Sequence, residues 1–338
     1  MEYSAKIYSR IGELMQGVLP DASAFLVGGL PSRQFFSEAV IRRAGPGEGA
    51  LPPKSMGADP SNAMAAPPSN AMAALPPGGL ASLTPEGLAS LPPKAMAALA
   101  VMERQLGLRL PEEVEIELRS NIPWGKGLSS SSTDVLSVLS VVNTFLGARL
   151  EAEALYRIAV EIEPTDPCLS DDIPIFYQHT GCSGGTVDLP PVALLFFDTA
   201  PGSMVDTLAM RRQWPAGAGE FFSWLLLRLV AAAVSEDYAQ LFESITSSAE
   251  YNQLSLPLPG FADLYRLAEE LGAGLVVAHS GTIAGLLVRP EQTSEARTRL
   301  ETLVDHRRVS GMTAQPVYLE NYSSPYHRSL CPPVFPVR

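Results

Sequence analysis

The residues best suited to chemistry lie in one short stretch, 123–132, with the sequence Pro-Trp-Gly-Lys-Gly-Leu-Ser-Ser-Ser-Ser. Alternating apolar residues over 114–119 predict a strand before it, and apolar residues at helical spacing over 134–145 predict a helix after it. A glycine-rich turn at a helix N-terminus presents backbone N–H groups and partial positive charge to an anion. Serine hydroxyls bond phosphate oxygens or Mg²⁺. The stretch therefore predicts a nucleotide-phosphate loop, and the alternative is an ordinary capped helix start.

Two familiar nucleotide-binding patterns do not fit this stretch. A P-loop places its lysine directly before Ser or Thr, whereas Lys126 is followed by Gly127. The dinucleotide pattern needs a third glycine, and Ser130 stands at that position. If the loop binds a nucleotide, it does so in another fold.

A second candidate is the acidic segment 161–167, where Glu163 and Asp166 are separated by Pro164 and Thr165. Phosphoryl transfer uses carboxylates to hold Mg²⁺ and to position or deprotonate the attacking hydroxyl. The segment follows a predicted helix, so the alternative is a solvated loop.

Two further segments could contact a ligand. Residues 278–286 form a turn of small residues between two apolar runs, which allows close backbone approach; the alternative is a plain hairpin turn. Near the N-terminus, 12–17 reads Gly-Glu-Leu-Met-Gln-Gly. Its Glu13 and Gln16 face either a ligand or an exposed hairpin.

Composition limits the classes of partner. The 338 residues are 46% hydrophobic and carry a formal net charge of −12, which argues against a nucleic-acid or anionic-membrane surface. Three cysteines give no paired framework, so we expect a reducing, cytoplasmic environment. The longest apolar run, 221–234, is too short to span a bilayer and predicts a buried helix.

The chain is punctuated by one unusual region. Residues 44–94 are rich in Pro, Ala, Gly and Met and contain short repeats, which predict a mostly irregular surface insertion. The rest predicts an α+β chain with a boundary between halves at 190/191. Helices are expected at 95–106, 134–145, 151–163, 219–235, 237–252, 261–271 and 291–304. Strands are expected at 5–9, 24–27, 35–41, 114–119, 175–178, 185–188, 192–198, 274–278, 283–288 and 315–319.

Taken in chain order, the segments 12–17, 123–132 and 278–286 resemble the three motifs of the GHMP kinase superfamily. Glu-Pro-Thr-Asp at 163–166 and Met-Val-Asp-Thr at 204–207 make the chain most similar to the L-threonine kinases of the cobalamin pathway. The resemblance covers nearly the whole chain except 44–94.

The resemblance implies a two-part fold with ATP and substrate in the cleft between the parts. Residues 1–190, with the insertion 44–94, would be an N-terminal ATP-binding domain similar to the second domain of ribosomal protein S5. Residues 191–338 would be a ferredoxin-like C-terminal domain. The implied ligands are ATP, Mg²⁺ and a small-molecule alcohol.

The resemblance also assigns roles to residues. Ser131 and Glu163 would hold Mg²⁺, and Asp166 would orient or deprotonate the substrate hydroxyl. The substrate-side candidates are Glu13, Asp206, Ser280 and Gly281. The candidates for binding the nucleotide phosphates are Pro123, Gly125, Lys126, Gly127, Leu128, Ser129, Ser130, Ser131 and Ser132.

The implied activity is an ATP-dependent kinase acting on a small polar alcohol, with L-threonine as the first candidate. Residues 9–11 and 28–33 depart from the threonine kinase pattern near the expected acceptor pocket, which leaves the alcohol open. A homoserine-like or specialised-metabolite alcohol is one alternative. A catalytically silent nucleotide- or metabolite-binding sensor on the same fold is another.

Overall fold

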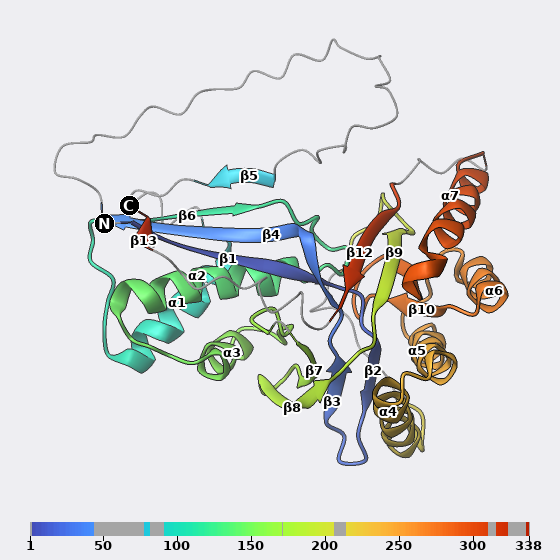
Figure 1. Ribbon diagram of the computed structural model, residues 1–338. Coiled ribbons are helices and arrows are strands. Elements are labelled where there is room, and N and C mark those ends of the chain that lie inside the picture. Colours follow the sequence, from blue (N-terminus) through green and yellow to red (C-terminus); the bar gives the residue numbers. More distant parts are fainter. Residues whose placement is uncertain are drawn as a thin grey trace, which may run out of the picture.

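The computed structural model describes the chain in seven ranges of residues. Within them the elements form two halves, each a sheet with helices against it, and a small sheet lies near their junction (Figure 1). The described residues are 2–43, 78–81, 91–170, 172–205, 214–309, 316–323 and 336–337.

The first half is built on a five-stranded antiparallel sheet in the order β13-β1-β4-β6-β5. Three helices pack on one face of it and enclose an apolar core with it. The helices are α1 (Pro93–Leu106), α2 (Ser130–Leu146) and α3 (Ala152–Val160). The strands are β1 (Glu2–Ile11), β4 (Leu30–Arg43), β5 (Gly78–Ala81), β6 (Val114–Ser120) and β13 (Pro336–Val337).

Local chemistry sets the limits of these elements. Pro93 stands at the first position of α1, where its missing N–H costs nothing, and Gly107 ends that helix in the left-handed conformation. β4 alternates buried and partly exposed residues along most of its length, as expected for a strand with one face on the core.

The second half contains a four-stranded antiparallel sheet in the order β10-β11-β9-β12. All six residues of β11 are buried, because helices cover this sheet. Its strands are β9 (Val192–Asp198), β10 (Gly274–Val277), β11 (Ile283–Val288) and β12 (Tyr318–Tyr322). Its helical elements are α4 (Ala218–Val234), α5 (Tyr238–Asn252), α6 (Phe261–Leu271), η2 (Pro290–Gln292) and α7 (Thr293–Val309).

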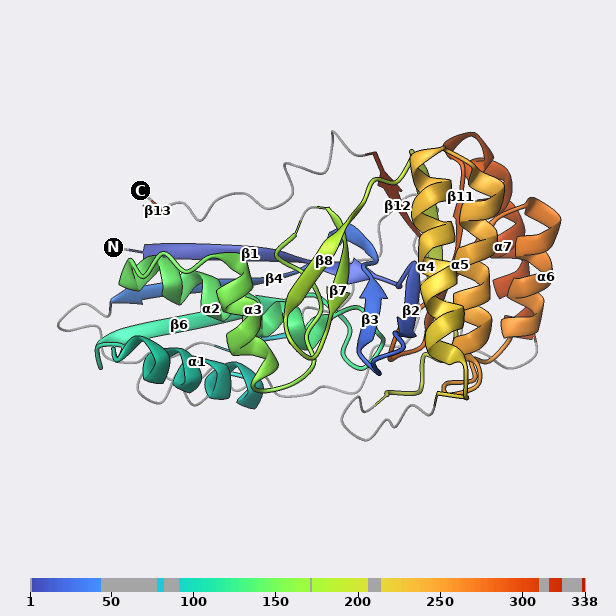
Figure 2. The same cartoon turned by 90° about the horizontal axis from the view of Figure 1, so that it is seen from below.

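A third, small sheet in the order β2-β3-β7-β8 lies beside α4 and α5, as Figure 2 shows. Its strands are β2 (Met15–Val18), β3 (Ala24–Val27), β7 (Ile173–Tyr177) and β8 (Cys182–Val187). One apolar cluster joins Met15 of β2 to Phe222 of α4 and Phe196 of β9. The two halves therefore share a core, and the division at 190/191 stays a prediction.

The predicted α+β class is confirmed, and most expected elements are present with shifted ends. The helix expected over 151–163 ends at Val160, before the acidic segment. The strand expected at 315–319 forms instead at Tyr318–Tyr322. Most of the repetitive region 44–94 lies outside the described residues; within it, Gly78–Ala81 is a strand, not irregular chain, and α1 already begins at Pro93. Among the described helices, none has the length and apolar character needed to cross a membrane.

Candidate active site

The described residues form a cavity of about 980 Å³ lined by parts of all the predicted motifs. Glu13 comes from the first motif, Ser280 from the third, and Glu163 and Asp166 from the acidic segment. The glycine- and serine-rich stretch contributes the largest group of lining residues. These are Trp124, Gly125, Gly127, Leu128, Ser129, Ser130, Ser131 and Ser132.

The N-terminus of α2 forms one wall of the cavity. Ser129 precedes the helix in the left-handed conformation, with φ of 55°. No side chain caps this helix start, and its first turn carries no acidic residue. The first N–H groups of a helix have no carbonyl partner within it and carry partial positive charge. This wall is therefore suited to an anion.

Beside it, the Ser131 hydroxyl donates a hydrogen bond to one oxygen of the Glu163 carboxylate. The other oxygen of Glu163 pairs with the ammonium of Lys94, from the start of α1. The side chain of Glu163 is only 7% exposed and that of Lys94 is 34% exposed. No sequence motif singles out Lys94; its only signal is a lysine directly after two prolines that begin a helix.

Asp166 lies on the same wall and is held on two sides. Its backbone N–H donates to the Ser132 hydroxyl at 3.0 Å, and the Gln178 amide donates to its carboxylate at 2.8 Å. Burial raises the pKa of Asp166, the hydrogen bonds from Ser129 and Gln178 oppose that rise, and the nearby charge of Glu163 adds to it. Gln178 follows β7 and was not singled out from the sequence.

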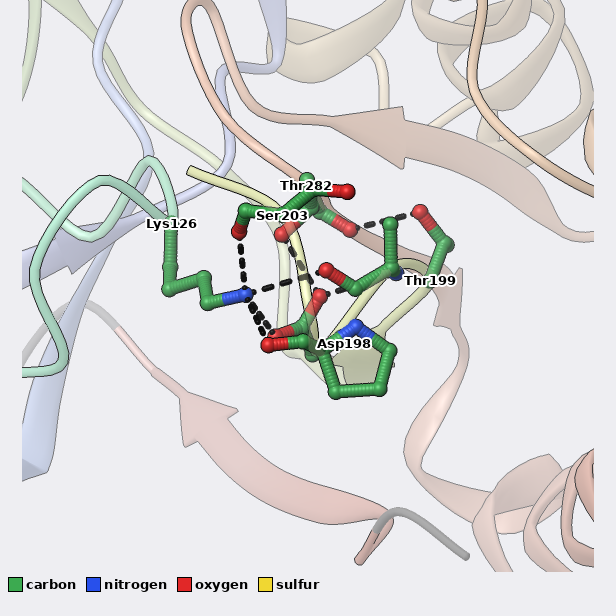
Figure 3. Close-up of polar contacts among 7 residues, drawn as sticks. Lys126, Asp198, Thr199, Ser203 and Thr282 are labelled. Atoms are coloured by element: carbon green, nitrogen blue, oxygen red, sulfur yellow. Dashed lines mark hydrogen bonds and ion pairs between the residues drawn. The ribbon is translucent and has the colours of Figure 1, made fainter. Parts of the chain in front are cut away.

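The sequence predicts a phosphate contact for Lys126, but this residue does not line the cavity. Its ammonium pairs with Asp198 at 2.7 Å and donates to the backbone carbonyls of Ala200, Pro201 and Ser203, as Figure 3 shows. A lysine ammonium has three N–H donors, and four oxygens surround this one. Asp198 ends β9, so no local sequence pattern could reveal the pair.

Two glycines explain why the loop and the third motif lie so close. A Cβ on Gly127 would come within 2.3 Å of the Ala278 Cβ. A Cβ on Gly281 would come within 2.2 Å of the Lys126 backbone. Both have positive φ, of 82° and 154°. The third motif thus packs directly against the turn at 125–127.

The remaining predicted residues fall in three groups. Glu13 lines the cavity and its backbone N–H bonds the Val277 carbonyl at 3.2 Å, which anchors the first motif to β10. Pro123 and Gly281 do not line the cavity. Asp206 lies outside the described residues.

The residues present fit a magnesium ion that also binds phosphate. A hydroxyl and a carboxylate are hard oxygen ligands, and protein sites for Mg²⁺ combine one or two carboxylates with substrate phosphates and waters. Within the described ranges, no cluster of three or more His, Cys, Asp or Glu side chains could hold a metal without such help.

Comparison with known proteins agrees with this arrangement. Residues 93–180 match the family described as GHMP kinases N terminal domain. The L-threonine kinase of Salmonella typhimurium is 30% identical over 193 residues, which cover 55% of this chain and 64% of that protein. A homoserine kinase of Desulfitobacterium hafniense is 28% identical over 223 residues, covering 62% and 72%. The chain thus spans just under two thirds of the threonine kinase's length.

The fold itself has solved counterparts. The homoserine kinase from Cytophaga hutchinsonii superposes with a TM-score of 0.58 at 16% sequence identity, covering 95% of this chain and 94% of that one. At that identity the likeness concerns the fold alone. The domain match over residues 93–180, the sequence relatives and the shared fold thus make this chain similar to the GHMP kinases.

Proposed function

We propose that this protein is an ATP- and Mg²⁺-dependent kinase that phosphorylates the hydroxyl of a small polar alcohol, with L-threonine as the first candidate. The observation that carries the proposal is that the N-terminus of α2 and the carboxylates of Glu163 and Asp166 line one cavity. An anion site facing two acids is the arrangement that phosphoryl transfer requires.

The nucleotide is assigned to the side of the cavity formed by the first half. Its triphosphate would lie against the N–H groups and hydroxyls of Ser129, Ser130 and Ser131. The start of α1, at Pro92, Pro93 and Lys94, lines the same cavity. Lys94 brings a positive charge to a chain whose net charge is −12.

Ser131 and Glu163 would hold Mg²⁺, which supplies charge neutralisation to the phosphates when bound. Because Lys94 pairs with Glu163 here, metal binding would release the ammonium toward the phosphates. Ser131 already touches Glu163, so the two ligands need little rearrangement.

Asp166 would orient the acceptor hydroxyl and take its proton. Gln178 occupies one carboxylate oxygen, Oδ1, and fixes the orientation of the group. The hydroxyl oxygen forms a bond to the γ-phosphorus, the bond from that phosphorus to the bridging oxygen breaks, and ADP leaves with the electron pair. The raised pKa of Asp166 makes this carboxylate a stronger proton acceptor than an exposed one.

The acceptor is assigned to the side that the second half completes. Met204, Val205, Trp214 and His279 line the cavity there, together with Glu13. The carboxylate of Glu13 suits the ammonium of an amino-acid alcohol. Relatives named threonine kinase and homoserine kinase support that class of acceptor.

The experiment is an ADP-release assay with purified protein, Mg-ATP and a panel of L-threonine, L-homoserine and L-serine. We expect turnover with at least one of them, greatest for L-threonine, and a phosphorylated product by mass spectrometry. Turnover with L-homoserine alone would move the assignment to that alcohol. Nucleotide binding without any product would favour a silent sensor.

A further inference from the structure

The contacts of Lys126 reach beyond the loop that carries it. The chain leaving β9 turns back over residues 198–205, and the Lys126 ammonium bonds three backbone carbonyls of that turn besides the Asp198 carboxylate. The Lys126 side chain is 11% exposed and that of Asp198 is 14% exposed. In so dry a setting an ion pair resists exchange with water.

The carboxylate of Asp198 extends this contact into the third motif. Its Oδ1 accepts hydrogen bonds from the Thr282 hydroxyl at 2.5 Å and from the Ala200 backbone N–H at 3.0 Å. The Lys126 carbonyl in turn accepts from the N–H groups of Thr282 and Ile283, at 3.0 and 3.2 Å. One residue therefore joins the phosphate loop, the end of β9 and the third motif (Figure 3).

The turn held in this way forms part of the cavity. Its last residues, Met204 and Val205, line the wall, and the Val205 N–H donates to the Gly125 carbonyl at 3.1 Å. Met204 also packs against Gly125, where an added Cβ would lie 3.0 Å from the Met204 Cβ. The acceptor side of the cavity is thus built directly on the phosphate loop.

We propose that Lys126 is a positioning residue that fixes the 198–205 turn and thereby sets the acceptor side of the site. Assigning that side to the acceptor rests on the proposed function. The ammonium touches neither substrate, because its donors are already used by protein oxygens. The phosphate loop and the acceptor wall then move as one body.

The test compares Lys126→Met, which keeps chain length and removes the charge, with the wild-type protein. We expect the acceptor KM to rise about tenfold while the affinity for an ATP analogue changes by less than about twofold, because only the acceptor wall loses its support. Hydrogen exchange should increase at the Val205 amide. A lysine that bound phosphate would give the reverse, with weak nucleotide binding and an unchanged acceptor KM, and that result would overturn the proposal.

Two further variants separate positioning from general damage. Asp198→Asn keeps acceptors for Thr282 and Ala200 but removes the charge, so it should raise the acceptor KM in the same way even if Lys126→Met does not fold. The double variant should be no worse than the poorer single variant, because both remove one contact. Independent, additive effects would contradict a shared role.

Glu320→Gln is the matched control. Glu320 is a buried carboxylate of the second half that accepts from Ser32 and from the Arg33 N–H of the first half, away from the cavity. Glu320→Gln should alter the stability of the protein but leave the KM for the acceptor and the KM for ATP unchanged. If the wild-type protein shows no turnover, the proposed function fails, and exchange at Val205 in the Lys126 and Asp198 variants still decides the positioning contact.

Discussion

Two lysine–carboxylate pairs flank the candidate active site, and their surroundings differ. In the open pair, Lys94–Glu163, the lysine is 34% exposed and the carboxylate faces the cavity beside Ser131. In the closed pair, Lys126–Asp198, both side chains are nearly buried and protein oxygens surround the ammonium. Under the proposed function, the open pair would exchange its partners for a metal and a phosphate, whereas the closed pair would hold the walls together.

The largest effect on turnover should come from Asp166, which lines the cavity together with the open pair. Asp166→Asn should lower kcat by about 10²–10⁴-fold, because the amide cannot take a proton from the acceptor hydroxyl. Affinity for ATP should stay within about threefold of wild type, since the phosphate loop is untouched. Steady-state kinetics and calorimetric ATP titration measure the two quantities. Asp188→Asn, at an exposed position outside the cavity, is the control. Unchanged turnover in Asp166→Asn would remove Asp166 from the mechanism.

A third buried carboxylate, that of Asp134, can be compared with Glu163 and Asp198. It is hydrogen-bonded by hydroxyls, and none of the lysines that the structure describes pairs with it. Asp134 is buried beside Ser37 and Ser120, and burial raises its pKa from 3.8 to about 6. A carboxyl whose pKa is higher in the folded state stabilises the fold while protonated. That contribution is complete below pH 3.8 and is lost as the pH rises through about 6.

Asp134→Asn should therefore be more stable than wild type at pH 8, by about 3 kcal/mol. The advantage should shrink steadily as the pH falls toward 4, because the wild-type carboxyl then becomes neutral as well. Urea unfolding at a series of pH values gives both curves. Parallel curves would show that Asp134 is not the group responsible for the pH dependence.

The smallest expected effect is that of Lys94→Met on stability, and it distinguishes Lys94 from Lys126. Lys94→Met should weaken ATP binding about tenfold, because the released ammonium no longer meets the phosphates. It should lower the free energy of unfolding by only about 1 kcal/mol, because Glu163 faces the cavity, where water replaces the ammonium, and keeps its hydrogen bond from Ser131. Lys126→Met should instead cost about 3 kcal/mol of stability, because the nearly buried Asp198 carboxylate, outside the cavity, loses its positive partner. If Lys94→Met and Lys126→Met lowered the free energy of unfolding equally, the contrast between the open and closed pairs would be wrong.

Much of the fold follows from local patterns, and the exceptions have physical causes. β9, α6 and β11 were predicted with their observed limits, since continuous apolar runs or helical periodicity define them. β2 was not assigned as a strand, because Gln16 and Gly17 obscure its pattern. Its four residues are buried only because α4 and α5 cover them, with the Ser248 hydroxyl accepting from the Gln16 N–H at 3.0 Å.

The candidate site also has a part that follows from the sequence and a part that depends on the tertiary structure. The sequence alone determined the glycine- and serine-rich turn before α2 and the acidic segment after α3, because residue type and adjacency define such features. Only the tertiary structure brought Asp166 against Ser132, placed Lys94 on Glu163, and turned Lys126 away from the cavity toward Asp198. The destination of a flexible, charged side chain depends on which partner the fold presents in a dry environment, and that partner can lie anywhere along the chain.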